Sequence, residues 1–376
     1  MSDRSLPVRR AWLGGGILLA IGAVAGFTFA LRAPTWDAVA PPPGAVWSLF
    51  AVGDTGLPPR SGRWWTPQVG VADALAASDR VHPVDALILL GDNFYPNGLE
   101  EATLEAQIAG NLVAPYCRFL SLEGPLSPQV APACPLPPGD RHPVPILAVL
   151  GNHDHVAPES PKLQAEVVSQ YLSNWRLEAG GAWVWETDLG VSVVFWDSTP
   201  GRLRSEIGRL GDALRASAGP WRIVVAHHPL DLSEKTEVVR AEIARSGVPI
   251  HLWLSGHEHN LQVSEPGEPG PALQVISGGG SDARGIKYDV PGRRFFAERQ
   301  GYARVDLVQP DPLRPEHEEL VVSLVSTRGM PIELWRRARL VSRWAIERTG
   351  RAWQRAGGRG EPLRYERKDS VDEPLQ

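Results

Sequence analysis

The chain has 376 residues and a mass of 40.9 kDa, with 43% hydrophobic residues, 22% charged residues and a formal net charge of -5. This length and apolar content suffice for one large domain or two ordinary ones, and they exclude a disordered or fibrous chain. The modest net charge gives no electrostatic reason to expect nucleic acid as a partner. Two cysteines exclude both a disulfide scaffold and a zinc site built from cysteines.

The amino terminus carries an apolar segment suited to export. Residues 11–31 contain no charged side chain, and a helix of this length is about 30 Å long, enough to span a bilayer. Arg9 and Arg10 before it predict that residues 1–10 are cytoplasmic and that the remainder is exported. A cleaved signal is the alternative, because Ala23 and Ala25 form an A-x-A site. A membrane-anchored protein on the periplasmic or cell-surface side and a secreted protein therefore both remain open.

A proline-rich linker over 32–46 leads into a predicted folded domain over 47–328. Within that domain, short apolar runs typical of strands buried on both faces alternate with segments of helical apolar spacing, which predicts an α/β fold. The expected strands lie at 46–52, 84–90, 144–150, 191–196, 221–226 and 250–254, and the expected helices at 66–79, 203–217 and 234–246. Later strands near 272–277, 301–307 and 319–325 are expected to complete a second sheet.

Two further segments carry expectations of their own. Cys117 and Cys134 lie in a proline-rich insertion, where export would allow them to form a loop-closing disulfide; two free buried thiols are the alternative. Residues 329–376 are predicted to hold a basic amphipathic helix over 332–355 and a disordered tail. That helix either lies on anionic lipid or docks on the domain with its arginines in solvent.

Polar side chains follow five of the expected strands. Because functional groups collect at the carboxyl ends of strands in α/β sheets, these side chains are expected to meet. Carboxylate, phenol, amide and imidazole groups form a mixed oxygen and nitrogen set, which suits iron, zinc or manganese. Their number is too large for one ion and indicates two ions that share a carboxylate. The candidate metal ligands are Asp54, Asp92, Tyr95, Asn152, His227, His257 and His259.

The blocks GDTG, GDNFY, GNHDH, VVAH and GHEHN closely resemble the five blocks of calcineurin-like metallophosphoesterases, in the version found in purple acid phosphatases. Ordinary members of that superfamily place a histidine where this chain has Gly56, and here Tyr95 closes the second block. Both features are typical of the purple subgroup, and the small, tartrate-resistant type is the most similar. The resemblance covers about residues 47–326.

This resemblance implies a four-layer α/β/β/α sandwich of two mixed sheets, with the site at one edge. It implies an Fe(III) ion held by Asp54, Asp92, Tyr95 and His259. Asp92 would bridge to a divalent ion (Fe, Zn or Mn), which is also held by Asn152, His227 and His257.

The implied reaction is the hydrolysis of small phosphate monoesters by in-line attack of a metal-bound hydroxide. Asn152 and His153 are expected to bind the phosphate, and His153 is also expected to protonate the leaving group. His228 replaces the tyrosine that is common in the small type and is expected to face the substrate, whereas His155 is assigned a supporting role. A phosphodiesterase or nucleotidase on the same centre, and a membrane-anchored binding module without turnover, are the alternatives. The natural ester and the oligomeric state remain open.

Overall fold

The computed structural model describes residues 38–57, 66–199, 203–231, 236–286, 290–311, 313–314, 317–328 and 337–357. The predicted cytoplasmic segment 1–10, the apolar segment 11–31, residues 32–37 of the linker and the tail after residue 357 lie outside these ranges. Within the described ranges, no helix is both long enough and apolar enough to cross a membrane.

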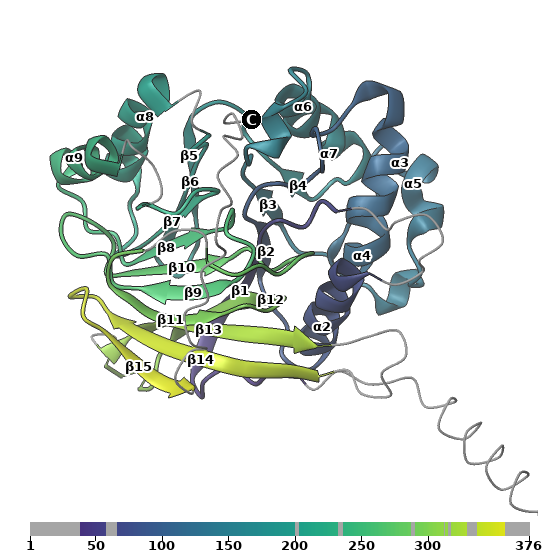
Figure 1. The fold of residues 1–376 in the computed structure, drawn as a ribbon. Helices are drawn as coiled ribbons and strands as arrows, with labels where there is room; N and C mark the ends of the chain where they lie inside the picture. Colours follow the sequence, from purple (N-terminus) through teal and green to yellow (C-terminus); the bar gives the residue numbers. More distant parts are fainter. Residues whose placement is uncertain are drawn as a thin grey trace, which may run out of the picture.

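The described residues form two mixed β-sheets that pack face to face, with helices on the outer sides (Figure 1). The eight-stranded sheet has the order β15 (Ala352–Gly357), β14 (Arg337–Glu347), β13 (Glu319–Arg328), β12 (Gly301–Val308), β1 (Ala45–Val52), β2 (Ala86–Leu89), β3 (Ile146–Ala148) and β4 (Trp175–Arg176). The seven-stranded sheet has the order β11 (Arg293–Ala297), β9 (Leu261–Ser264), β10 (Leu273–Ser277), β8 (Leu252–Ser255), β7 (Trp221–Ala226), β6 (Val191–Trp196) and β5 (Ala182–Glu186). The expected α/β sandwich of two mixed sheets is confirmed.

Helices cover both outer faces of this sandwich (Figure 1). Thr66 caps the longest helix of the eight-stranded side, since its hydroxyl accepts a hydrogen bond from the Val69 N–H, and Pro67 occupies the first turn. That side carries α2 (Pro67–Val81), α3 (Leu104–Ile108), α4 (Ala114–Tyr116), α5 (Ser127–Val130), α6 (Ser160–Lys162) and α7 (Val168–Tyr171). The seven-stranded side carries α8 (Leu203–Ala216) and α9 (Thr236–Ser246).

The four layers explain why the strands are apolar without alternation. Successive side chains of a strand point to opposite faces of its sheet. In β1, Leu49 and Ala51 therefore enter the core between the two sheets, whereas Phe50 and Val52 enter the core beneath the helices. Both faces exclude water, so both sets of side chains are apolar.

The placement of the later strands differs in part from the expectation. The strand at 272–277 joins the second sheet as β10, but β12 and β13 belong to the first sheet. β12 pairs antiparallel with β1, and β13 pairs with β12. On its other edge β1 pairs with β2, so β12 satisfies the main-chain groups that β1 would otherwise leave unpaired.

The predicted basic amphipathic helix over 332–355 is wrong. Where that segment is described, it forms the strands β14 and β15, which pair as a hairpin at the edge of the eight-stranded sheet. Trp344 and Ile346 both face the core between the sheets, two residues apart, as a strand requires. Gly350, with a φ of +83°, lies in the turn between the strands. β-Branched and aromatic residues favour strands, and here this preference outweighs the helix-like apolar spacing.

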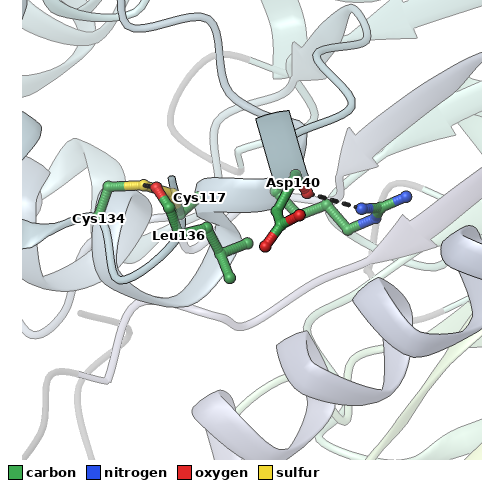
Figure 2. Close-up of a disulfide and its surroundings, with 5 residues drawn as sticks. Cys117, Cys134, Leu136 and Asp140 are labelled. Carbon is green, nitrogen blue, oxygen red and sulfur yellow. Dashed lines mark hydrogen bonds between the residues drawn. A yellow bond between two sulfur atoms is a disulfide. The ribbon is translucent and has the colours of Figure 1, made fainter. Parts of the chain in front are cut away.

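Cys117 and Cys134 form a disulfide, with their Cα atoms 5.3 Å apart (Figure 2). The alternative of two free thiols is therefore wrong. Arg118, next to Cys117, donates through Nε to Asp79 of α2 at 2.6 Å and through Nη1 to the carbonyl of Asp140 at 2.8 Å. The disulfide closes a loop within the insertion, and the ion pair of Arg118 with Asp79 ties the insertion to α2.

Candidate metal centre

The seven candidate ligands lie at the carboxyl ends of strands from both sheets. β1, β2 and β3 supply the first three blocks from the eight-stranded sheet, whereas β7 and β8 supply the last two from the seven-stranded sheet. Main-chain hydrogen bonds tie the first two loops together: the Asp54 N–H donates to the Gly91 carbonyl at 3.0 Å, and the Tyr95 N–H donates to the Gly56 carbonyl at 3.1 Å. The site is therefore built across the shared edge of the sandwich.

Three of the candidate ligands have a left-handed backbone. Asp54, Asp92 and His257 have φ values of 57°, 53° and 68°, and they are the only positive-φ residues other than glycine among those described. Such a conformation costs roughly 1–3 kcal/mol and persists only where the surrounding structure imposes it. Because this conformation recurs at three strand ends, we infer that these turns direct the ligand side chains into the site at some cost in local stability.

Two glycines make room for this arrangement. A Cβ atom at Gly151 would lie 2.2 Å from Asp92 Oδ1, which no side chain can tolerate. A Cβ atom at Gly56 would lie 2.6 Å from main-chain atoms of Asn93 and Phe94. No side chain therefore fits at Gly56, and this includes the histidine of the ordinary superfamily members.

One group of donors forms around the Tyr95 hydroxyl. This oxygen lies 2.7 Å from Asp92 Oδ2, 3.1 Å from Asp54 Oδ1 and 3.1 Å from His259 Nε2. His259 Nε2 and Asp54 Oδ1 are 3.3 Å apart. Donors bound to a common ion at about 2.0–2.2 Å are roughly 3–3.5 Å from one another, and three of these four distances lie in that range.

A second group lies on the other side of Asp92. Asn152 Oδ1 is 3.2 Å from His227 Nε2 and 3.1 Å from His257 Nδ1, and the two imidazole nitrogens are 3.3 Å apart. Asp92 Oδ1 is 3.5 Å from His227 Nε2, while Asp92 Oδ2 faces Tyr95. The two oxygens of one carboxylate thus face two separate donor groups.

The hydrogen bonding of His227 tests whether this second group suits a cation. Its Nδ1 lies 2.9 Å from the Leu90 carbonyl oxygen and must donate to it, so in the neutral ring Nε2 carries a lone pair. That lone pair faces the amide oxygen of Asn152, which is also an acceptor. The two lone pairs repel unless a proton on Nε2 or a cation lies between them. Burial would lower the pKa of His227, but the charges of Asp92 and Asp54 outweigh it and raise that pKa, so this position favours positive charge. The residues therefore fit a metal ion at this position.

The electrostatics of the first group also favour a cation. Burial and the charges of Asp54 and Asp92 raise the pKa of Tyr95 well above its ordinary value, so the phenol needs a strong Lewis acid to ionise. Burial alone would lower the pKa of His259, but the attraction of Asp54 outweighs it and raises that pKa to about 9. Among the described residues, buried His259 Nδ1 has no partner within hydrogen-bond distance; Asp282 Oδ2 is 3.8 Å away.

His153 and His228 both lie beside these groups. His153 Nδ1 is 2.7 Å from the Pro96 carbonyl oxygen, and its ring centroid is 4.5 Å from that of Tyr95. The ring centroid of His228 is 4.5 Å from that of His257. Burial and the neighbouring imidazoles lower the pKa of His228 well below its ordinary value. The structure therefore brings every site residue expected from the sequence to one place.

Distance alone also groups donor atoms that could share an ion. Within the described ranges, two sets have donor atoms that all lie within 4.8 Å of one another. One set is Asp54, Asp92 and His227, and the other is His227, His228 and His257. By this criterion His228 is a further potential ligand, beside the seven expected from the sequence.

Sequence reasoning missed Asp154, which is fully buried behind the ligands. Its carboxylate accepts hydrogen bonds from the main-chain N–H groups of Gly151 at 2.9 Å, Asn93 at 3.0 Å and Phe94 at 3.1 Å. It thereby holds the second and third loops in register. Burial and the charge of Asp92 raise its pKa to about 6. The signal was present in the block GNHDH, where an aspartate sits between two histidines.

The end of β6 was also missed. Asp197 and Ser198 follow the apolar run 191–196 directly, just as the candidate ligands follow the other strands. Asp197 Oδ2 lies 3.0 Å from His155 Nε2, and Ser198 Oγ lies 3.0 Å from His228 Nδ1. The ring of His155 is therefore held by a carboxylate.

The fold and these donor groups define a layered α/β domain with the side chains of a metal-dependent phosphoesterase. A family profile described as calcineurin-like phosphoesterase matches residues 49–261. The chain belongs to the calcineurin-like phosphoesterase family, whose members are metal-dependent hydrolases of phosphate esters.

Solved structures show the same fold at low sequence identity. GAP50, described as the anchor in the inner membrane complex of Plasmodium, is 16% identical over 78% of this chain and 88% of its own, with a TM-score of 0.55. PhoD is 11% identical over 86% of this chain and 75% of its own, with a TM-score of 0.50. A purple acid phosphatase from yellow lupin (Lupinus luteus) seeds is 14% identical over 77% of this chain and 53% of its own, with a TM-score of 0.47. A search of curated proteins gave no significant match.

Proposed function

We propose that the protein is a binuclear acid phosphatase of the purple type, nearest to the small, tartrate-resistant enzymes, and that it hydrolyses phosphate monoesters. One observation carries the proposal: Asp92 turns one carboxylate oxygen toward Tyr95 and the other toward His227. This is the geometry of a carboxylate shared by two ions.

Each ion has its own set of residues in this proposal. Tyr95 favours Fe(III) at the first position, because a phenol with a raised pKa ionises only beside a strong Lewis acid. When bound, the two ions polarise the phosphate and activate a water for attack on phosphorus. The first ion is held by Asp54, Asp92, Tyr95 and His259, and the second, a divalent Fe, Zn or Mn, by Asp92, Asn152, His227 and His257.

His153 completes the reaction as the general acid. Its Nδ1–H donates to the Pro96 carbonyl, which fixes the ring, so the transferable proton is the second one, which Nε2 carries in the imidazolium form. That proton passes to the leaving oxygen as its bond to phosphorus breaks. Asn152 precedes His153 in the chain and, as a ligand of the second ion, lies where the phosphate must bind.

A substrate panel with metal analysis on one preparation tests this function. We expect iron plus a second metal, and faster hydrolysis of aryl and alkyl monoesters than of diesters at acid pH. Preference for a diester would replace the proposal with a phosphodiesterase on the same centre. A fully loaded protein without turnover on any ester would favour a binding module, in keeping with the anchor role for which GAP50 is named. The converged donor groups argue for catalysis.

We also propose that residues 11–31 carry the domain across a membrane, either as a retained anchor or as a cleaved signal. The absence of charge over this segment supports the proposal. Fractionation of cells that express the full chain distinguishes the two forms. Recovery with membranes indicates an anchor, recovery in the soluble exported fraction indicates cleavage, and recovery in the cytoplasm would overturn both.

A further inference from the structure

Ser198 makes two contacts with the same residue. Its Oγ accepts a hydrogen bond from the main-chain N–H of His228 at 3.0 Å, and the same oxygen lies 3.0 Å from His228 Nδ1. Ser198 is 2% exposed, so water cannot replace either contact. The hydroxyl therefore binds both the backbone and the ring of His228.

The direction of the hydrogen bond between Ser198 Oγ and His228 Nδ1 follows from the number of hydrogens and lone pairs on a hydroxyl group. A hydroxyl has one hydrogen to donate and two lone pairs to accept with. If His228 Nδ1 donated to Ser198, the hydroxyl would accept twice, and its own buried hydrogen would lack an acceptor among the described residues. Buried hydrogens are rarely left unpaired. Ser198 thus donates to Nδ1, and the proton of the neutral ring sits on Nε2.

This result decides between two roles for His228. One of its ring nitrogens lies within 4.8 Å of the donor nitrogens of His227 and His257, which by distance alone would allow it to bind metal. With Nδ1 occupied by Ser198 and Nε2 protonated, neither nitrogen offers a lone pair to an ion. A protonated Nε2 instead suits an anionic phosphate oxygen.

We propose that Ser198 is a positioning residue that holds His228 as an Nε2–H donor to the substrate phosphate and keeps it out of the metal coordination. The proposal rests on the proposed phosphatase function for its consequence on turnover. The bond between Ser198 and His228 itself does not depend on that function, because both contacts belong to the protein alone.

Matched variants at position 198 test the proposal. Ser198→Thr keeps the hydroxyl, Ser198→Val has nearly the same shape without it, and Ser198→Ala removes it with little bulk. The ¹⁵N resonances of His228 are measured in histidine-labelled full-length protein and assigned by their loss in His228→Gln. Metal content, KM and kcat for a phosphate monoester are measured on the same preparations, and thermal unfolding confirms that each variant is folded.

We expect wild-type His228 to show a protonated Nε2 and a hydrogen-bonded, unprotonated Nδ1. The Nδ1 resonance should move in Ser198→Ala and Ser198→Val but not in Ser198→Thr. KM should rise roughly threefold to tenfold without the hydroxyl, the effect of one hydrogen bond, while kcat and metal content stay close to wild type. A proton on Nδ1 in the wild type, an unmoved Nδ1 resonance in both variants, or loss of a metal ion from His228→Gln would overturn the proposal. A wild type without activity would instead refute the phosphatase function, while the resonances would still decide the role of Ser198.

Discussion

Replacing His153 with alanine separates the chemistry of the centre from its metal binding. Among the described residues, the side chain of His153 hydrogen-bonds to the Pro96 carbonyl alone, whereas its contact with Asp92 Oδ1 runs through the main-chain N–H at 2.9 Å. His153→Ala keeps that main-chain bond. We therefore expect both metals to remain bound while the general acid is lost.

The size of the effect depends on the leaving group. Loss of a general acid typically lowers the rate by about 10²–10⁴-fold, which corresponds to roughly 3–5.5 kcal/mol of barrier. An alkoxide leaves poorly without a proton, so kcat for alkyl esters such as glycerol phosphate should fall by the whole of this factor, about 10²–10⁴-fold. A nitrophenolate leaves well by itself, so nitrophenyl phosphate should lose much less.

The assay compares kcat for a series of esters of graded leaving-group pKa. His155→Ala is the matched control, because this neighbouring histidine bonds to Asp197 and is not expected to transfer a proton. Equal loss of kcat for every leaving group would show that His153 does not act as the acid. Loss of metal from His153→Ala would show that the backbone argument is wrong.

Three further predictions concern the phenol ligand, a buried histidine and the disulfide. Iron-loaded wild type should absorb visible light through charge transfer from Tyr95, and Tyr95→Phe should abolish the band; a colourless iron-loaded wild type would contradict the ligand assignment. Burial lowers the pKa of His251 below its ordinary 6.5, so the unfolded chain binds a proton that the folded chain does not, and the contribution of this residue to stability falls as the pH drops below about 6.5. The difference in Tm between metal-loaded wild type and His251→Gln, which does not titrate, should therefore shrink from pH 7.5 to 5.5; a constant difference would count against this reasoning. Replacing Cys117 and Cys134 with serine should lower the free energy of unfolding by about 3 kcal/mol in urea titrations, the chain-entropy value for a loop of this size, and leave metal content unchanged.

The strands of the sandwich were predictable wherever local pattern decides the structure. Runs such as 191–196 and 221–226 become strands over the same residues, because burial on both faces requires an unbroken apolar run. The sheet to which β12 belongs was not predictable, since that pairing joins residues about 250 positions apart and depends on the free edge of β1. The hairpin of β14 and β15 was predicted wrongly as a helix for a related reason. Its apolar residues fit both periods, and pairing with β13 adds to the strand preference of its β-branched and aromatic residues.

The candidate metal ligands could be predicted from the sequence, whereas the residues that support them could not. Asp54, Asp92 and His257 follow buried strands in blocks with a recognisable resemblance, so their convergence could be expected from the sequence alone. Asp154 and Ser198 are not among the candidate ligands, and their importance lies in hydrogen bonds to other loops. Such bonds depend on distances that exist only after the two sheets have packed.

The backbone of the centre explains why a cation belongs to the folded state. Three ligand residues, Asp54, Asp92 and His257, hold a left-handed conformation that costs roughly 1–3 kcal/mol each, and this cost is present whether or not an ion is bound. Asp92 lies near the buried Asp154, and burial together with the repulsion of Asp92 raises the pKa of Asp154. Cations between the donor groups would relieve that repulsion and the facing lone pairs of Asn152 and His227 at once. Metal binding is therefore expected to contribute to stability as well as to chemistry, because the same side chains that would hold the ions oppose one another without them.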